Sequence, residues 1–297
     1  MVSTIHVNFT MHKRAFFAVF ATMMLSVIPC SLAMAQENVR PNRMIEAFKT
    51  GRPAIAGLDF QIVEAEHKPF VLTEVIDSIQ SVLIKKNEHG QPILPPIVRL
   101  PMEGDENAGW AIKAVLERGA MGIIIPHTET SDDALRVIRQ IRPWNVRDSK
   151  YPFPAGHRSG GGSANWGFEN LSRAAGDIWP LNPDGEVLFF PMVESLVGLS
   201  NLVEILETPG VSGIIAGPGD LTAALGLAGG ESNRPPELTD ILENIGQICR
   251  ERMKYCGMVS GNEADANRWL DAGFKFIWRL DLRDATSGNW YATQYNR

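Results

Sequence analysis

Residues 96–126 read PIVRLPMEGDENAGWAIKAVLERGAMGIIIP, and this stretch decides the fold. Two apolar runs, at 96–100 and 122–126, have the residue types of buried strands, and they flank an amphipathic segment at 108–118. A strand, a helix and a second strand in this order predict two parallel strands joined by a crossover helix. Gly119 stands where a glycine commonly ends a helix. The stretch therefore predicts a parallel α/β architecture.

The same alternation continues on both sides of this unit. Six helices are expected around the sheet, after a short first helix at 43–49. An eighth strand could lie at 53–57, but it runs almost directly into residue 60, and adjacent parallel strands need a crossover of about a dozen residues. We expect a TIM-type (β/α)8 barrel whose first β-α unit is compressed: either the barrel is one unit short or it closes in an unusual way. The expected strands are 60–66, 96–100, 122–126, 187–194, 211–216, 256–260 and 274–280, and the helices are 70–85, 108–118, 131–141, 196–207, 236–254 and 263–272.

Residues 1–35 have the pattern of a secretory signal peptide. Lys13 and Arg14 precede a nearly continuous apolar run, and Ala33-Met34-Ala35 is a small-residue cleavage motif. The run is too short for the ~20 residues that a spanning helix needs, which argues against a membrane anchor. We expect cleavage after Ala35, export to the periplasm or the outside, and no membrane association of the mature chain.

Residues 36–297 have the usual length of one barrel, and no repeat or linker divides them, so we expect a single domain. Loss of the leader would change the net charge from −6 to −8, which argues against nucleic acid as a partner. Cys249 and Cys256 are too few for a disulfide scaffold, so free thiols are expected.

The segment 144–184 is long and rich in Gly, Pro, Asn and Ser. A loop of this length in a compact domain is usually functional or mobile. We expect it to carry the substrate specificity, although its aromatic side chains could equally serve packing. The residues in question are Trp144, Tyr151, His157, Arg158 and Trp166.

Charged groups and an imidazole follow several expected strands: Glu66 and His67, then Arg99, Glu194 and Asp220. The ends of barrel strands share one face, where catalytic groups converge. A carboxylate that ends an apolar strand is costly unless it is paired or metal-bound, so Glu194 and Asp220 are candidate ligands of Mg²⁺ or Mn²⁺. The alternative is that both are solvated loop carboxylates.

Asp220 also opens a helix-like stretch, whose free N–H groups favour an anion such as a substrate carboxylate. The alternative is a simple helix cap. His67 taken alone is more often structural than a base, and His127 has the same ambiguity.

Several segments, in this order, resemble the HpcH/HpaI-type class II 2-oxo-acid (pyruvate) aldolases, relatives of the citrate lyase β subunit. Each segment is moderately specific, and together they form a strong signal over roughly residues 58–276. They are LDFQIVEAEH at 58–67, VRLP at 98–101, GAMGIIIPH at 119–127, YPFPAGHR at 151–158, MVES at 192–195, PGV at 209–211 and GPGDLT at 217–222.

The resemblance implies a homo-oligomeric lyase that uses a divalent metal to cleave a 4-hydroxy-2-oxo acid into pyruvate and an aldehyde. It implies that Glu194 and Asp220 bind the metal, and that Arg99 contacts the keto or enolate oxygen. His67 would take part in proton transfer, with Glu117 as its partner in place of the usual Asp. Pro218 and Gly219, together with Asp220, would complete the substrate site.

The sequence departs from the family pattern in the compressed first unit, in Met192 where many members have Gln, and in the tail after Leu280. Export is also unusual for a family that serves mostly cytosolic catabolism, including that of aromatic compounds. These departures leave two alternatives: an exported binding protein for 2-oxo or 2-hydroxy acids without catalysis, and a lyase for acyl-CoA esters.

Overall fold

The computed structural model describes residues 40–144, 150–159, 166, 173–229 and 233–278. The expected leader at 1–35 and the tail after Leu280 lie outside these residues. Among the described helices, none combines the length and the apolar character needed to cross a membrane.

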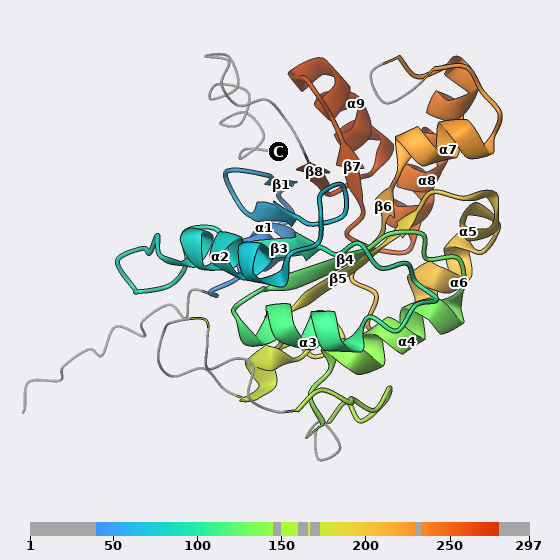
Figure 1. Ribbon diagram of the computed structural model, residues 1–297. Helices are drawn as coiled ribbons and strands as arrows, with labels where there is room; N and C mark the ends of the chain where they lie inside the picture. The colour runs from blue at the N-terminus through green and yellow to red at the C-terminus, as the bar shows by residue number, and fades with distance from the viewer. Residues whose placement is uncertain (1–39, 145–149, 160–165, 167–172, 230–232, 279–297) are drawn as a thin grey trace, which may run out of the picture. The chain divides into compact units, whose positions relative to one another are not determined.

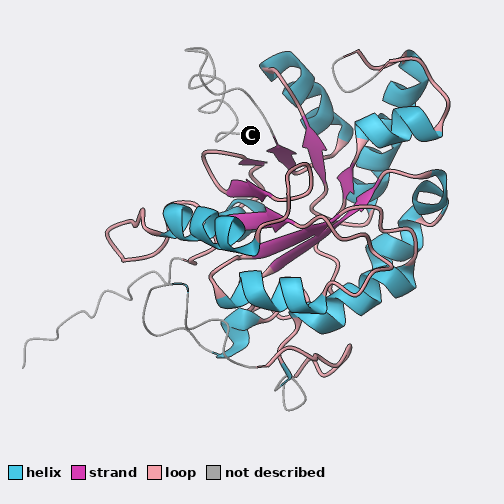
Figure 2. Cartoon of the chain, in the orientation of Figure 1, coloured by secondary structure: helices cyan, strands magenta, loops and turns pink. Residues whose placement is uncertain are grey.

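Strands and helices alternate along the described chain as expected (Figure 1). In the views of Figures 1 and 2 the strands lie in the middle and most helices lie outside them. The strands are β1 (Ala54–Ile55), β2 (Gln61–Glu64), β3 (Pro96–Arg99), β4 (Gly122–Ile125), β5 (Leu188–Val193), β6 (Ile215–Ala216), β7 (Gly257–Val259) and β8 (Phe276–Trp278). The helices are α1 (Arg43–Lys49), α2 (Leu72–Leu83), α3 (Gly109–Glu117), α4 (Ser131–Ile141), α5 (Leu196–Ser200), α6 (Leu202–Glu207), α7 (Pro218–Ala224), α8 (Pro236–Glu251) and α9 (Glu263–Ala272), with a 3₁₀ turn at Arg173–Gly176.

Local chemistry accounts for the helix ends. Thr130 and Asp133 form a capping box that starts α4. Gly119 and Gly273 follow α3 and α9 with φ of 108° and 128°, in the left-handed region that glycine adopts at little cost. The single helix expected at 196–207 is two helices, because Asn201 leaves helical geometry and its side chain donates to the Glu129 carbonyl.

The eight strands form one parallel sheet in the order β1-β8-β7-β6-β5-β4-β3-β2, as expected of a TIM-type barrel. Its two ends, β1 and β2, are joined only by a tight turn, in which Gly57 has φ of 84°. A single parallel bridge between Ala56 and Phe60 links them. Asp59 holds the turn through Arg52 and the Ile55 N–H. Of the two expected alternatives, the barrel therefore has all eight strands and closes without a first crossover helix.

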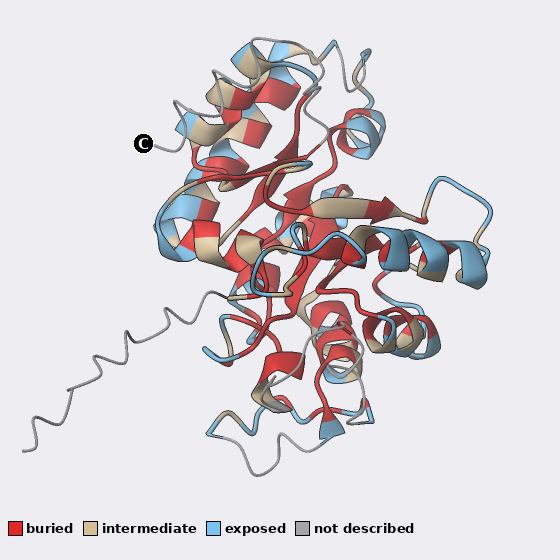
Figure 3. Ribbon diagram, turned by 90° about the vertical axis from the view of Figure 1, so that its left-hand side faces the viewer, coloured by how far each residue is buried: buried red, intermediate tan, exposed pale blue. Residues whose placement is uncertain are grey.

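The core has two layers, because alternate residues of each strand point to opposite faces of the sheet. Ile123 and Ile125 pack outward with the helices, whereas Ile124 packs inside the curled sheet. Helix α1 joins this inner layer, and Phe48 stacks on Tyr255 with ring centres 4.5 Å apart. Figure 3 shows the buried strands and the exposed outer faces of the helices.

The long connection between α4 and β5 leads from the end of a helix to the start of a strand. Buried Arg142 donates to both carboxylate oxygens of Asp177 at 2.8 Å and also to the carbonyls of Tyr151 and Pro154. Arg158 is buried and donates to the carbonyls of Ile141 and Gly176. These contacts lie at the amino ends of the strands and show that Arg158 packs within the chain, which argues against a part for it in specificity. Trp166 is likewise part of the core.

The expectation of two free thiols was also wrong. Cys249, near the end of α8, and Cys256, just before β7, form a disulfide with their Cα atoms 6.1 Å apart. The chain reverses between them through Met253, whose φ is 53°. Their spacing in the sequence does not reveal this reversal, which brings the two buried side chains together.

Candidate active site

The predicted catalytic and ligand side chains lie where the strands end. His67 and Glu66 follow β2, Arg99 is the last residue of β3, and Glu194 follows β5. Asp220 lies in the first turn of α7, just after β6. Because the strands are parallel, these ends share one face, and they enclose a pocket of about 380 Å³. The pocket is lined by His67, Arg99, Met192, Glu194, Gly217, Pro218, Gly219, Asp220, Val259 and Trp278.

Three side chains on this face could hold a metal ion. One ligand atom from each of His127, Glu194 and Asp220 lies within 4.8 Å of the other two. Glu194 is buried and its Oε1 accepts the N–H of His127 at 2.8 Å. Burial raises the pKa of Glu194, the His127 N–H lowers it, and the nearby Asp220 carboxylate raises it. A cation would offset both the burial and the repulsion, so the donor set fits a divalent metal.

Sterics explain why the motif at 217–220 begins with glycine. A Cβ on Gly217 would collide with the carboxylate of Glu194 and would lie 2.7 Å from its Cβ. Only glycine lets the chain after β6 pass this close to the carboxylate. At Gly219, by contrast, a Cβ would meet nothing within 4 Å. The helix begins at Pro218, so Asp220 is not its cap as one reading proposed.

Arg99 is held rigidly from several sides. Its Nε donates to Glu64 Oε2 at 2.8 Å, and its Nη1 lies 2.5 Å from Glu66 Oε2. Its guanidinium carbon lies 4.7 Å from the centre of the Trp278 ring, in cation–π geometry. On the remaining side, Met192 Sδ lies 3.9 Å from Nη1. A planar cation fixed in this way suits the recognition of an oxyanion.

His67 is exposed at the pocket, and its Nε2 lies 3.6 Å from Glu66 Oε2. Burial raises the pKa of Glu66, while the charges of Arg99 and His67 lower it. Glu64 Oε1 accepts the N–H of Glu66 at 2.8 Å and so stabilises the turn after β2. His67 therefore has a carboxylate partner within its own turn.

The predicted partner of His67, Glu117, is not at this site within the chain. Glu117 ends α3 and lies 3.8 Å from Lys113. The chain continues to Met121, whose N–H bonds to the carbonyl of Pro96 at the start of β3. Glu117 is thus at the amino ends of the strands, opposite His67. The resemblance assigned Glu117 from its position in the motif, although the expected helix at 108–118 already put it at the helix end that leads into β4, away from the carboxyl ends of the strands.

Three members of the site were not assigned from the sequence. Glu64 and Trp278 hold Arg99, and His127 joins the two carboxylates. Glu64 could have been found, because it pairs with Arg99 in the register of β2 and β3. Trp278 could not have been found, since its contact with Arg99 forms only when the strands curl round into a barrel.

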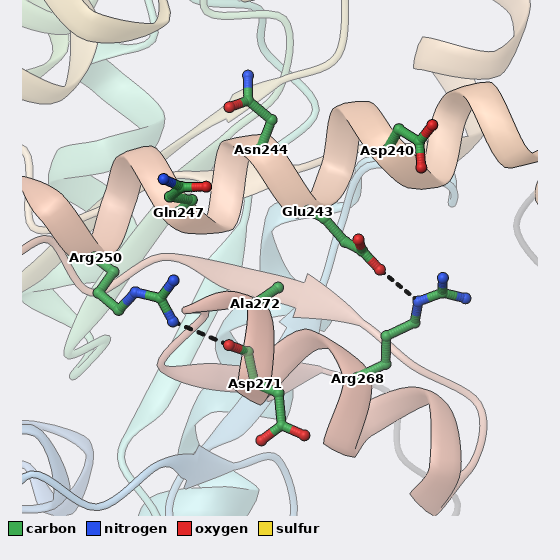
Figure 4. A pocket seen from close by; sticks show the side chains of 8 residues that line it. All are labelled: Asp240, Glu243, Asn244, Gln247, Arg250, Arg268, Asp271 and Ala272. Carbon is green, nitrogen blue, oxygen red and sulfur yellow. Dashed lines mark hydrogen bonds and ion pairs between the residues drawn. The ribbon is translucent and has the colours of Figure 1, made fainter.

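A larger cleft, of about 570 Å³, lies between α8 and α9 (Figure 4). Its two arginines have partners within the cleft: Arg268 donates to Glu243 at 2.7 Å, and Arg250 donates to the backbone carbonyl of Asp271. Among the described residues, the metal-ligand grouping lies elsewhere, at the carboxyl ends of the strands. The smaller pocket is therefore the candidate active site.

Comparison with known proteins decides the family. The family model described as HpcH/HpaI aldolase/citrate lyase matches residues 50–280. The chain belongs to this family. Members of the HpcH/HpaI family similar to this chain include named aldolases, and this chain is accordingly a lyase.

Two relatives and one solved structure illustrate the family membership. A hydroxypyruvate/pyruvate aldolase of Roseobacter denitrificans is 30% identical over 226 residues, covering 75% of this chain and 77% of the relative. A 4-hydroxy-2-oxo-heptane-1,7-dioate aldolase of Salmonella dublin is 29% identical over 259 residues, covering 80% and 87%. The crystal structure of an HpcH/HpaI aldolase from Desulfitobacterium hafniense, 22% identical, matches with a TM-score of 0.58 over 87% of this chain and 89% of that chain, which supports the fold.

Proposed function

We propose that this protein is a divalent-metal-dependent aldolase that cleaves a 4-hydroxy-2-oxo acid into pyruvate and an aldehyde. The observation that carries the proposal is the convergence of Glu194, Asp220, Arg99 and His67 on one pocket. The two relatives carry names of aldolases for 2-oxo acids, which agrees with this substrate class.

Glu194 and Asp220 would hold the metal, and Mg²⁺ or Mn²⁺ suits their oxygen donors. Bound there, the ion would withdraw electron density from the keto oxygen and favour the enolate. Gly219 and Asp220 lie in the first turn of α7, where backbone N–H groups lack helical acceptors. We propose that the substrate carboxylate lies against this turn.

The chain's own groups would carry the bond cleavage. His67 accepts the proton of the substrate's 4-hydroxyl group, directly or through water, as a general base. The C4–O bond becomes the aldehyde carbonyl while the C3–C4 bond breaks, and its electron pair forms the C2–C3 double bond of the enolate. Arg99 donates to the developing enolate oxygen. Return of a proton to C3 then gives pyruvate, so the atoms balance without an oxidant or reductant.

The ligand assignment predicts that Glu194→Gln and Asp220→Asn each abolish measurable Mn²⁺ binding and activity while the fold is retained, because each removes a charged oxygen donor. Calorimetric titration with Mn²⁺ measures the affinity, and circular dichroism checks the fold. Unchanged Mn²⁺ affinity in both variants would refute the site.

Exchange of pyruvate methyl protons with D₂O tests the enolate step without the right aldehyde. The wild type with Mn²⁺ or Mg²⁺ should exchange them, and Arg99→Lys, which keeps the charge but loses the planar fork, should not. His67→Ala should lower kcat for cleavage by about 10²–10⁴-fold. Proton NMR measures the exchange, and its absence in metal-loaded wild type would favour a binding protein over an aldolase.

We also propose that the protein is exported. Support comes from the pattern of residues 1–35 and from the Cys249–Cys256 disulfide, since such bonds persist mainly in oxidising compartments. Mass spectrometry of protein recovered from a bacterial periplasm should find cleavage after Ala35. An intact N-terminus there would refute export by this route.

A further inference from the structure

We propose that His127 is a third protein ligand of the metal, bound through an imidazole nitrogen, and that it makes the site prefer Co²⁺ and Zn²⁺ over Mg²⁺. The inference rests on the metal site of the proposed function and changes its donor set from two carboxylates to two carboxylates and a nitrogen.

The first support is distance. The ligand atoms of His127, Glu194 and Asp220 all lie within 4.8 Å of one another, and His127 Nδ1 lies 3.8 Å from Glu194 Oε1. Two donors that each lie about 2.1 Å from one ion are at most about 4.2 Å apart. Only one pair of the three can be opposite each other, and donors at right angles lie about 3.0 Å apart, so closing the group around a metal needs side-chain shifts of up to about 1 Å, which rotation of the imidazole or of the Asp220 carboxylate can supply.

The second support is the backbone of His127, which is independent of the side-chain distances. Its φ is 41°, in the left-handed region that non-glycine residues rarely adopt. Such a conformation costs free energy and persists only where the surroundings enforce it, as at functional sites.

Two hydrogen bonds enforce this conformation. The N–H of His127 donates to Glu194 Oε1 at 2.8 Å, and the N–H of the next residue, Thr128, donates to the carbonyl of Met192 at 3.1 Å. Both bonds tie the end of β4 to the end of β5. The turn therefore holds the imidazole beside the carboxylate and positions Glu194 as well.

The third step is donor chemistry. Mg²⁺ binds oxygen and takes up nitrogen donors poorly, whereas an imidazole favours the later divalent ions Co²⁺ and Zn²⁺, whose affinities exceed that of Mn²⁺ in the Irving–Williams series. A nitrogen ligand therefore makes the affinities for these ions differ more than they would at a site of carboxylates and water alone. His67, the other imidazole on this face, pairs with Glu66 instead.

The test uses His127→Gly, because glycine tolerates the left-handed backbone and keeps the N–H that orients Glu194 while removing the ring. His67→Ala is the matched control, since it removes the other imidazole. Pulsed EPR of bound Mn²⁺ should show coupling to an imidazole ¹⁴N in the wild type and in the control, but not in His127→Gly. Calorimetric titration should show Co²⁺ and Zn²⁺ binding at least about tenfold weaker in His127→Gly, with Mg²⁺ affinity nearly unchanged.

The outcomes separate the inference from the proposed function. Mn²⁺ binding without ¹⁴N coupling in the wild type, or coupling that persists in His127→Gly, overturns the role of His127 as a ligand and leaves the carboxylate site standing. Equal Co²⁺ affinity in wild type and variant has the same meaning. If none of these ions binds the wild type, or if binding survives Glu194→Gln together with Asp220→Asn, the metal site itself fails.

Discussion

Gly217 offers a direct test of how the fold shapes the metal site. A Cβ at this position would lie 2.7 Å from the Cβ of Glu194, about 0.7 Å short of the 3.4 Å at which ordinary contact begins, and would collide with the carboxylate. The Cβ of Glu194 is attached to the backbone directly after β5 and cannot move far. In Gly217→Ala the carboxylate must therefore swing out of its place.

The displacement of the Glu194 carboxylate determines how much Mn²⁺ affinity is lost. Metal–ligand distances are held within about 0.2 Å, so a shift of several tenths of an ångström disables a ligand. Disturbing the orientation of a ligand typically costs about 10–100-fold in metal affinity, or roughly 1.4–2.7 kcal/mol. Overpacking of this kind also costs about 1–3 kcal/mol of stability. We expect a folded but less stable protein that binds Mn²⁺ at least tenfold more weakly.

Calorimetric titration of the wild type, Gly217→Ala and Gly219→Ala with Mn²⁺ measures this effect. Gly219→Ala is the matched control, because its added methyl meets nothing within 4 Å and lies in the same helical turn. Its affinity should equal that of the wild type. If Gly217→Ala binds Mn²⁺ as tightly as Gly219→Ala, the close approach does not shape the site and our reasoning fails.

Three further predictions concern stability. Asp177→Asn leaves the buried Arg142 without a counter-charge, so the free energy of unfolding in urea should fall by about 3–5 kcal/mol, and an unchanged midpoint would contradict this. Burial raises the pKa of Glu186 from 4.5 to about 7, so the native state holds this proton more tightly than the unfolded chain. The protonated carboxyl of Glu186 therefore contributes about 3 kcal/mol to the free energy of unfolding below pH 4.5, and this contribution is lost as the pH rises to 7. In thermal melts at a series of pH values, Glu186→Gln should show a weaker dependence of the melting temperature on pH. Cys249→Ser with Cys256→Ser should lower the unfolding free energy by about 2 kcal/mol, and a reductant should then no longer affect the midpoint.

The architecture was predictable because its signals are local. Apolar runs such as β4 and amphipathic segments such as α3 can be recognised from a few consecutive residues. Parallel strands joined by helices then have few ways to pack. The closing turn at 56–60 was only half predictable. The short spacing excluded a crossover helix, but it did not show that Ala56 and Phe60 would bridge in parallel.

The site was predictable where a strand end alone places a side chain, as for Arg99, Glu194 and the turn with Asp220. It was not predictable where the contact depends on two distant segments. His127 joins the carboxylates only because its backbone turns into the left-handed region, and no residue type at 126–128 demands that. Glu117 is a different case: it was assigned from a matching motif, and within one chain it lies at the amino ends of the strands, away from His67.

The pairing of β1 with β8, and of Phe48 with Phe276, has a consequence for how the polypeptide acquires its structure. The two rings are 6.3 Å apart in space and 228 positions apart in the chain. A chain emerging from the ribosome or from a translocation channel exposes Phe48 long before its partner is available. Until β8 is synthesised, the edge of β1 that pairs with it stays unpaired, and the inner core lacks the side chains of β8. Completion of the barrel is therefore a late, long-range event, slow in the way that non-local contacts are slow.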